Sequence, residues 1–329
     1  MKIRFKDIIK QLYLDLIGKD SHRGVTLTYA WLANQFGHFG LGFIPSIILI
    51  LSLPDDSFWN RYAAVVVAIF WLVFELYNFL GPLLLSRVPY VFKPKWANIG
   101  FDTITDLGFF WIGAGVAGWI GANQLGIWLL LPIGGIIVSI GTPYWFKTKI
   151  YVQEAVFPYQ LRLSQWFGNL NSSEKPYIQN FINSKNNSDH LLVFGQVRTG
   201  KTKLAVGIGT EMSIAHNSVL YITGMRILTE LSVSKEVGKR DTLWNWKSAS
   251  TLVIDDINPG HPGAEIITPK QLSEIISASP QDQFSEIISR KKVVWVLGDY
   301  GESNRTEWVD FVHDIGVSED KIRQVVLAK

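Results

Sequence analysis

The chain has 329 residues, a formal net charge of +3 and no cysteine. This length exceeds what one ordinary hydrophobic core organises, so two domains are expected. The lack of cysteine excludes disulfides, thiolate metal sites and cysteine catalysis. The small positive charge follows from basic residues beside apolar runs, which leaves a nucleic-acid partner unsupported.

Residues 1–24 are predicted to form a basic, cytoplasmic N-terminal segment. The start, MKIRFKDIIK, continues into the polar residues 18–24 rather than into a short apolar run with a cleavage site. The pattern of a removable signal peptide is therefore missing.

Four apolar stretches follow, and each is long enough to cross a bilayer, which needs about 20 residues of helix. They cover residues 25–53, 58–85, 99–122 and 126–146. The third stretch repeats small residues four apart at Gly113, Ala117 and Gly121, a pattern that lets helices pack closely. We predict a four-helix transmembrane bundle over residues 25–146, in which these small residues pack the chain's own helices together; a dedicated oligomer interface is the alternative.

Basic residues flank the apolar stretches on one side of the predicted membrane. They precede the first stretch and follow the second and the fourth, as Lys2, Arg4, Lys6, Lys10, Lys19, Arg23, Arg87, Lys93, Lys95, Lys147 and Lys149. Because such residues stay on the cytoplasmic side, both termini should face the cytoplasm. The chain is expected to be an integral membrane protein of the bacterial inner membrane, in contact with membrane lipids.

Four ionisable residues interrupt the apolar stretches at comparable depths: His38, Glu75, Asp102 and Asp106. A charge at such a depth is costly and usually faces a partner or water. We therefore expect these residues to form one intramembrane polar layer. Two interpretations stay open: a proton or cation relay or sensing core, and a hydrogen-bonded knot that only fixes the packing of the helices.

Residues 147–188 are predicted to connect the two halves of the chain. Up to residue 165 they mix charges with apolar side chains around a break at Pro158, and polar stretches rich in Asn and Ser follow. An amphipathic segment of this kind is expected to lie along the membrane surface.

From His190 onward, strand-like and helix-like segments alternate, which is typical of a doubly wound sheet. Strands are expected at residues 191–194, 219–223, 251–255, 293–297 and 324–327, and helices at 201–214, 224–231, 269–277, 285–289 and 305–314. Residues 189–329 are therefore predicted to form a cytoplasmic α/β domain around a five-stranded, mostly parallel sheet.

A glycine-rich loop joins the first of these strands to the first helix. It has the pattern G-x-x-x-x-G-K-[ST], and its candidate nucleotide-binding residues are Gly195, Arg198, Thr199, Gly200, Lys201, Thr202 and Lys203. In such a loop, backbone N–H groups and the positive end of the helix converge on phosphates. The lysine reaches the β- and γ-phosphates, and the hydroxyl after it ligates Mg²⁺. Residues 189–329 are therefore predicted to be a P-loop NTPase domain, and its predicted cofactors are ATP and Mg²⁺.

The third predicted strand, TLVIDD, ends in two carboxylates. Strand ends in this fold meet at the nucleotide crevice. Asp255 is therefore the expected partner of Thr202 in holding Mg²⁺, and Asp256 is expected to polarise the attacking water.

These motifs resemble the additional-strand P-loop ATPases, and within them the AAA+-like ATPases of the DnaA, DnaC and IstB type. The resemblance lies in GQVRTGKTKLA, SVLYITG and TLVIDDI, between about residues 190 and 297. It implies ATP hydrolysis with Mg²⁺ and assembly into a homo-oligomer, in which an arginine of one subunit completes its neighbour's site. The chain departs from the family at Asp256, where most relatives carry glutamate, and in its preceding membrane stretches.

The resemblance also implies further catalytic residues. In the family the fourth strand ends in a polar sensor of the γ-phosphate, and Asp299 stands at that position. An arginine acting on a neighbouring site stabilises charge on the transferring phosphoryl group. Arg290, just before the fourth strand, and Arg305, just after it, are the candidates, and an ordinary surface arginine is the alternative at either position.

The sequence thus predicts a membrane-anchored ATPase that couples cytoplasmic ATP binding and hydrolysis to conformational change or assembly in its transmembrane bundle. It would drive transport, secretion or assembly of a macromolecule, as a homo-oligomer with other membrane or cytoplasmic proteins as partners and low turnover without them. One alternative is a nucleotide-controlled membrane switch or effector in signalling or defence. The other is a membrane-anchored DNA translocase.

Overall fold

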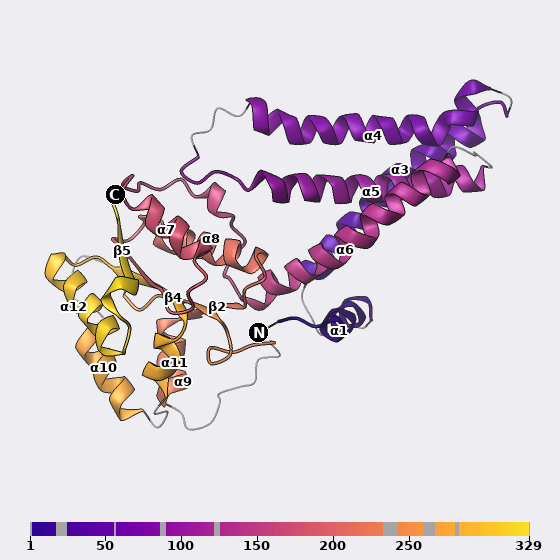
Figure 1. The fold of residues 1–329 in the computed structure, drawn as a ribbon. Coiled ribbons are helices and arrows are strands. Elements are labelled where there is room, and N and C mark those ends of the chain that lie inside the picture. The colour runs from indigo at the N-terminus through magenta and orange to yellow at the C-terminus, as the bar shows by residue number, and fades with distance from the viewer. Residues whose placement is uncertain are drawn as a thin grey trace. The chain divides into compact units, whose positions relative to one another are not determined.

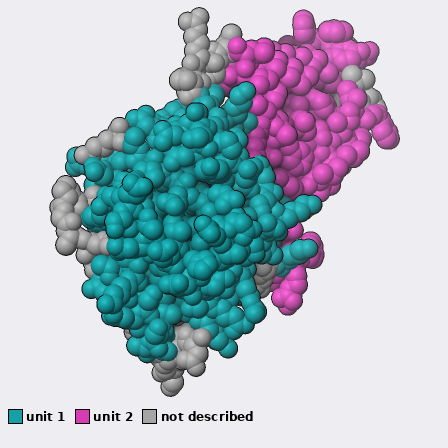
Figure 2. Space-filling model, turned by 60° about the vertical axis from the view of Figure 1, so that its left-hand side comes forward, with its two compact units in different colours: residues 1–2, 90–94, 151–329 teal, residues 3–89, 95–150 magenta. Residues whose placement is uncertain are grey.

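A computed structural model describes residues 2–17, 25–55, 57–85, 90–121, 126–232, 243–258, 267–279 and 283–328 (Figure 1). Lys19, Arg23 and Arg87, which helped to predict the orientation, lie outside this part of the chain. The structure divides into two compact units, which Figure 2 distinguishes by colour. Unit 1 comprises Met1–Lys2, Tyr90–Pro94 and Tyr151–Lys329, and unit 2 comprises Ile3–Pro89 and Lys95–Ile150.

Unit 2 is helical, and the predicted transmembrane helices are confirmed as four helices long and apolar enough to cross a membrane. Its elements are α1 (Phe5–Leu16), α3 (Leu27–Ser52), α4 (Phe58–Leu85), α5 (Trp96–Ile120), the short π-helical η1 (Gly126–Leu130) and α6 (Leu131–Glu154). Helix α6 runs past the predicted end at residue 146, because Lys147, Lys149 and their neighbours are compatible with helix. Its end, from Tyr151 on, belongs to unit 1.

Helices α3 and α5 approach closely through two glycines. A Cβ at Gly42 would collide with the backbone carbonyl of Phe110, and a Cβ at Gly113 with the carbonyl of Phe39. Small residues at a helix contact allow such an approach. The predicted use of Gly113 in packing the chain's own helices is therefore confirmed, and Gly42 is its counterpart on α3.

The sheet of unit 1 has five parallel strands in the order β2-β3-β4-β1-β5. They are β1 (His190–Gly195), β2 (Val219–Thr223), β3 (Thr251–Asp255), β4 (Lys292–Gly298) and β5 (Ile322–Leu327). The predicted α/β fold is confirmed, and the sheet is wholly parallel. β4 lies between β1, which leads into the glycine loop, and β3, which ends at Asp255.

Helices cover both faces of this sheet (Figure 1). α8 (Lys201–Ile214) lies on one face, together with α7 (Lys175–Asn183). On the other face lie α9 (Gly224–Ser232), α10 (Pro269–Ala278), α11 (Phe284–Ser289) and α12 (Glu302–Asp314). Right-handed crossovers explain the division, because only the connection from β1 to β2 runs toward the β2 edge of the sheet.

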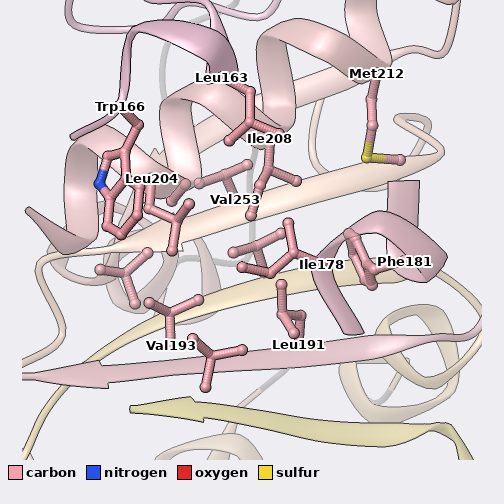
Figure 3. Close-up of a cluster of buried hydrophobic side chains, with 14 of the residues drawn as sticks. Leu163, Trp166, Ile178, Phe181, Leu191, Val193, Leu204, Ile208, Met212 and Val253 are labelled. Carbon is pink, nitrogen blue, oxygen red and sulfur yellow. The ribbon is translucent and has the colours of Figure 1, made fainter. Parts of the chain in front are cut away.

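The segment before β1 is part of the core of unit 1. Leu163, Trp166, Ile178 and Phe181 are buried in one cluster with side chains of the sheet and α8, as Figure 3 shows. The interpretation of residues 147–188 as a separate surface connector is therefore corrected: from Tyr151 on, they belong to unit 1. Leu163, one of the apolar side chains that made the segment amphipathic, lies in this cluster, and Phe157 packs against it.

His190, at the start of β1, is fully buried and neutral. Its Nδ1 accepts a hydrogen bond from Trp295 Nε1 at 3.0 Å, so its Nε2 carries the proton and donates to the Ile288 carbonyl at 3.3 Å. Burial lowers the pKa of His190 to about 4. A second proton on this ring would break the bond from Trp295.

We predict that Gly42→Ala lowers the thermal stability of the detergent-solubilised protein, while Gly37→Ala does not. The methyl group that alanine adds at position 42 has no room beside Phe110, and overpacking costs about 1–3 kcal/mol. A Cβ at Gly37 meets nothing within 4 Å, and alanine gains about 1 kcal/mol of helix propensity there. Equal unfolding midpoints for the two variants would contradict the close contact.

His190 also predicts a pH dependence of stability. Between pH 4 and 6.5 the unfolded chain binds a proton that the folded chain does not, so the free energy of unfolding rises with pH through this window. The stability lost on acidification is about 3 kcal/mol. Urea unfolding from pH 4 to 7.5 should show this slope in the wild type and in His313→Asn, whose histidine is exposed. The slope should flatten in His190→Asn.

Candidate nucleotide-binding site

The glycine loop runs from the end of β1 to the start of α8. A Cβ at Gly195 would lie 2.6 Å from the hydroxyl of Thr199, and Gly200 has a φ of +88°. Thr199 closes the turn, because its hydroxyl donates to the carbonyl of Gln196 at 2.8 Å. The two glycines of the motif are therefore required by the shape of this loop.

Lys201 is the first residue of α8 and folds back over the loop. Its Nζ donates to the Gln196 carbonyl at 3.0 Å, and the residue is only 8% exposed. Burial lowers the pKa of Lys201, and three nearby carboxylates, those of Asp255, Asp256 and Asp299, oppose that change. The ammonium group thus stands at the loop among the acidic residues that follow β3 and β4.

The predicted metal-binding pair is brought together. The Thr202 hydroxyl donates a hydrogen bond to the Asp255 carboxylate, which also accepts from the backbone N–H of Asp256 at 2.8 Å. Burial raises the pKa of Asp255, and these hydrogen bonds oppose the shift. No group of three or more His, Asp or Glu residues converges on a metal position in the described chain. The pair therefore offers two oxygen ligands, and a Mg²⁺ ion held there would take its others from water and phosphates.

Sequence reasoning missed a tyrosine that orients Asp255. The hydroxyl of Tyr221 donates to Asp255 Oδ2 at 2.9 Å. Burial and the Asp255 charge raise the pKa of Tyr221, so the hydroxyl stays protonated and remains a donor. The strand pairing could have indicated this contact. Tyr221 lies on β2, beside β3, and pairs with Val253, which precedes Asp255 by two residues.

Asp256 is exposed, directly after β3, with a φ of +56°. Aspartate and asparagine tolerate this left-handed conformation better than most residues. Its charge acts on Lys201. The structure therefore places Asp256 at the mouth of the loop, where it can reach water.

Asp299 and Arg305 form an ion pair at the same edge of the sheet. Arg305 Nη1 lies 3.4 Å from Asp299 Oδ2, and the backbone N–H of Asp299 donates to the carbonyl of Gly195 at 3.2 Å. Asp299 is thus joined directly to the loop. Arg305, expected to act on a neighbouring subunit, pairs here with an acidic residue of its own chain.

Arg290 lies away from the loop. It precedes β4, whose opposite end carries Asp299, and its side chain is 75% exposed in an ion pair of 2.9 Å with Glu286. Because β4 spans seven residues, at about 3.3 Å per residue its two ends are about 20 Å apart. Arg290 can therefore serve no phosphate bound to its own chain.

Two further candidates from the loop point outward. Lys203 is exposed on α8, and Arg198 is exposed at the tip of the loop with a φ of +69°. Of the predicted nucleotide-binding residues, the structure brings together Gly195, Thr199, Gly200, Lys201 and Thr202.

A cavity of about 500 Å³ opens beside the glycine loop. Its lining comes from the segment before β1, the loop itself and the end of β5, as Phe167, Gly168, Asn169, Val197, Arg198, Thr199 and Ala328. Asn169 and Ala328 form an isolated antiparallel bridge that holds two of its walls together. Phe167 is 63% exposed and offers a free aromatic face.

Within unit 2, the residues of the predicted polar layer also converge. His38 Nε2 lies 3.6 Å from Asp106 Oδ2, and Gln35 donates to Asp106 Oδ1 at 2.9 Å. Glu75 is 7% exposed, and the charges of Asp102 and Asp106 act on it. Gln35 was missed, although its position one helical turn before His38 places both on the same face of α3.

No protein-family model and no curated protein matches this chain. Among solved structures it is similar to one titled "Crystal Structure of the DnaI", with 14% identity and a TM-score of 0.34, over 52% of this chain and 89% of that chain. A likeness with so low a TM-score supports no conclusion about activity. The sheet order and the loop geometry of this chain define a P-loop-like fold on their own.

We predict that Gly200→Ala weakens nucleotide binding by about tenfold or more, which corresponds to 1.4 kcal/mol. A Cβ in this left-handed conformation costs about 1–2 kcal/mol, and it would also lie 3.2 Å from Trp166 Nε1. Gly316→Ala is the matched control, because Gly316 also has a positive φ, +99°, and a Cβ there meets only ordinary contacts, with Ser289 at 3.7 Å. Both variants should lose stability, and titration with a fluorescent ATP analogue should find reduced affinity only for Gly200→Ala.

Proposed function

We propose that this chain is a membrane-anchored ATPase whose unit 1 binds ATP with Mg²⁺ and hydrolyses it. One observation carries the proposal: Lys201, in a glycine loop, lies at the same sheet edge as the hydrogen-bonded pair of Thr202 and Asp255. A cation, a hydroxyl and a carboxylate in this arrangement suit a nucleoside triphosphate with its metal ion. An ordinary surface lysine or acidic turn would not require this cation, hydroxyl and carboxylate to lie together.

Each residue of the site has a defined task in this proposal. Backbone N–H groups of the loop and Lys201 bind the phosphates, and Thr202 and Asp255 hold Mg²⁺, which when bound neutralises charge on the phosphates. Asp256 orients the attacking water and accepts its proton. Asp299 acts at the γ-phosphate by holding Arg305 in an ion pair. When that pair opens, the guanidinium of Arg305 becomes available to the phosphate oxygens.

The cavity beside the loop is the proposed site for the base. Its volume suits a nucleoside, and it adjoins Val197 and Thr199 of the glycine loop. Phe167 would stack on the base, and the amide of Asn169 would hydrogen-bond its edge. Stacking on an aromatic ring tolerates any base, so preference for adenine would rest on the hydrogen bonds.

The process that ATP turnover drives takes place in the membrane. The four apolar helices support an integral membrane location, and the basic flanks support a cytoplasmic unit 1 with both termini on that side. We propose that ATP turnover in a homo-oligomer drives transport, secretion or assembly of a macromolecule, with further proteins as partners. Exposed Arg290 is the candidate for completing a neighbour's site.

We predict that Lys201→Ala abolishes ATP binding, while Asp256→Asn leaves binding intact and slows turnover about 100-fold or more, the usual contribution of a general base. Asparagine is suited to the left-handed backbone at this position. Lys270→Ala, at an exposed lysine on α10, is the control for charge. Binding is measured by calorimetry and turnover by phosphate release, with full-length protein in nanodiscs.

The wild type decides between this function and its alternatives. Tight ATP binding without detectable phosphate release would replace the ATPase with a nucleotide-controlled switch. Salt-sensitive binding of DNA would instead indicate a translocase, because phosphate contacts release counterions. Failure to bind ATP would refute both the ATPase and the nucleotide-controlled switch.

A further inference from the structure

The short linker between α4 and α5 contributes to the core of unit 1. Residues 90–94 lie between two membrane helices in the sequence, yet they belong to unit 1. Phe92 is 3% exposed and is a member of the same buried cluster as Leu163, Trp166 and Leu204, and Val91 packs against that cluster. An ordinary loop between two spans has no need to bury an aromatic side chain in another unit's core.

Phe92 contacts the side chain that holds the glycine loop. The ring centroids of Phe92 and Trp166 are 6.1 Å apart. Lys175, the first residue of α7, places its Nζ 5.9 Å from the centroid of the Phe92 ring. Trp166 is 1% exposed, and its Nε1 donates to the carbonyl of Gly200 at 3.1 Å. Figure 3 shows the indole beside Leu204, at the first turn of α8.

The Gly200 carbonyl is a sensitive point of the loop. It precedes Lys201 directly and also accepts the backbone N–H of Leu204 at 2.9 Å, which begins α8. The indole stands where a side chain at Gly200 would point, since a Cβ there would lie 3.2 Å from Trp166 Nε1. Trp166 therefore fixes the peptide from which the phosphate-binding lysine and the helix both start.

We propose that Trp166 is a positioning residue for the nucleotide site and that Phe92 links it to the α4–α5 connection of the membrane bundle. The proposal rests on the proposed nucleotide binding. Displacement of residues 90–94 would loosen the indole and its bond to Gly200, which weakens the phosphate loop. Coupling between two sites is reciprocal, so bound nucleotide must also hold the linker in place.

The first test removes the indole N–H and keeps an aromatic ring. Trp166→Phe should raise the dissociation constant for ATP about 5- to 10-fold, as expected for one lost hydrogen bond. Trp244→Phe is the matched control, because Trp244 is 2% exposed and donates to a backbone carbonyl, that of Val219, at 2.8 Å. Its affinity for ATP should equal that of the wild type. Equal affinities in both variants would overturn the role of Trp166.

The second test uses the absence of cysteine from the chain. In full-length protein, Val91→Cys should react with a maleimide about 5-fold more slowly when ATP and Mg²⁺ are bound, the lower range of coupling between sites. Lys93 is exposed, so Lys93→Cys should react at the same rate with and without ATP and Mg²⁺. In the Trp166→Phe background, at saturating ATP, the protection of Cys at position 91 should disappear.

Binding of a fluorescent ATP analogue to each labelled variant separates the possible failures. If the analogue binds and the reaction at position 91 is unchanged by ATP, the linker is uncoupled and only this inference falls. If the analogue does not bind to the wild type, the proposed function falls and the inference falls with it. A slower reaction at both positions 91 and 93 would show a general change of exposure and would also overturn the link.

Discussion

Unit 1 depends on holding a short loop still in backbone conformations that most residues avoid. Arg198 and Gly200 both have positive φ, and such strain persists only where the surroundings over-determine it. Here β1 is buried at every residue between β4 and β5, and α8 is buried along most of its length. The loop between them is therefore held at both ends by buried elements.

The same sheet topology explains why the chain before His190 is drawn into the core. Right-handed crossovers place α9 to α12 on one face and leave only α8 on the other. A single helix cannot cover a five-stranded sheet, so α7, the segment around Trp166 and the linker with Phe92 complete that layer. The pieces nearest to the glycine loop thus come from parts of the chain adjacent to membrane helices.

In unit 2, the cost of intramembrane charge is met by grouping polar side chains. Asp106 accepts from Gln35 and lies near His38, and the acidic residues Asp102 and Glu75 are close enough to act electrostatically on the others. Depth along each apolar stretch was readable from sequence, because it only requires counting residues. Whether the side chains share a direction depends on the rotation of each helix, and for α3 and α5 the close contact through Gly42 and Gly113 fixes that rotation.

The sequence by itself determined the elements and the chemistry of the loop. Hydrophobic runs predicted four long helices, alternation predicted five strands, and the motif at residues 195–202 predicted the loop that joins β1 to α8, because these signals are local. Only the tertiary structure decided that Tyr221 orients Asp255, that Arg305 pairs with Asp299, and that Trp166 supports Gly200. The contacts of Tyr221 with Asp255 and of Trp166 with Gly200 each join residues 34 positions apart, so they depend on strand order and on how the buried side chains fill the α8 face. Arg305 follows Asp299 by only six residues, but the turn between β4 and α12 decides whether the two side chains meet.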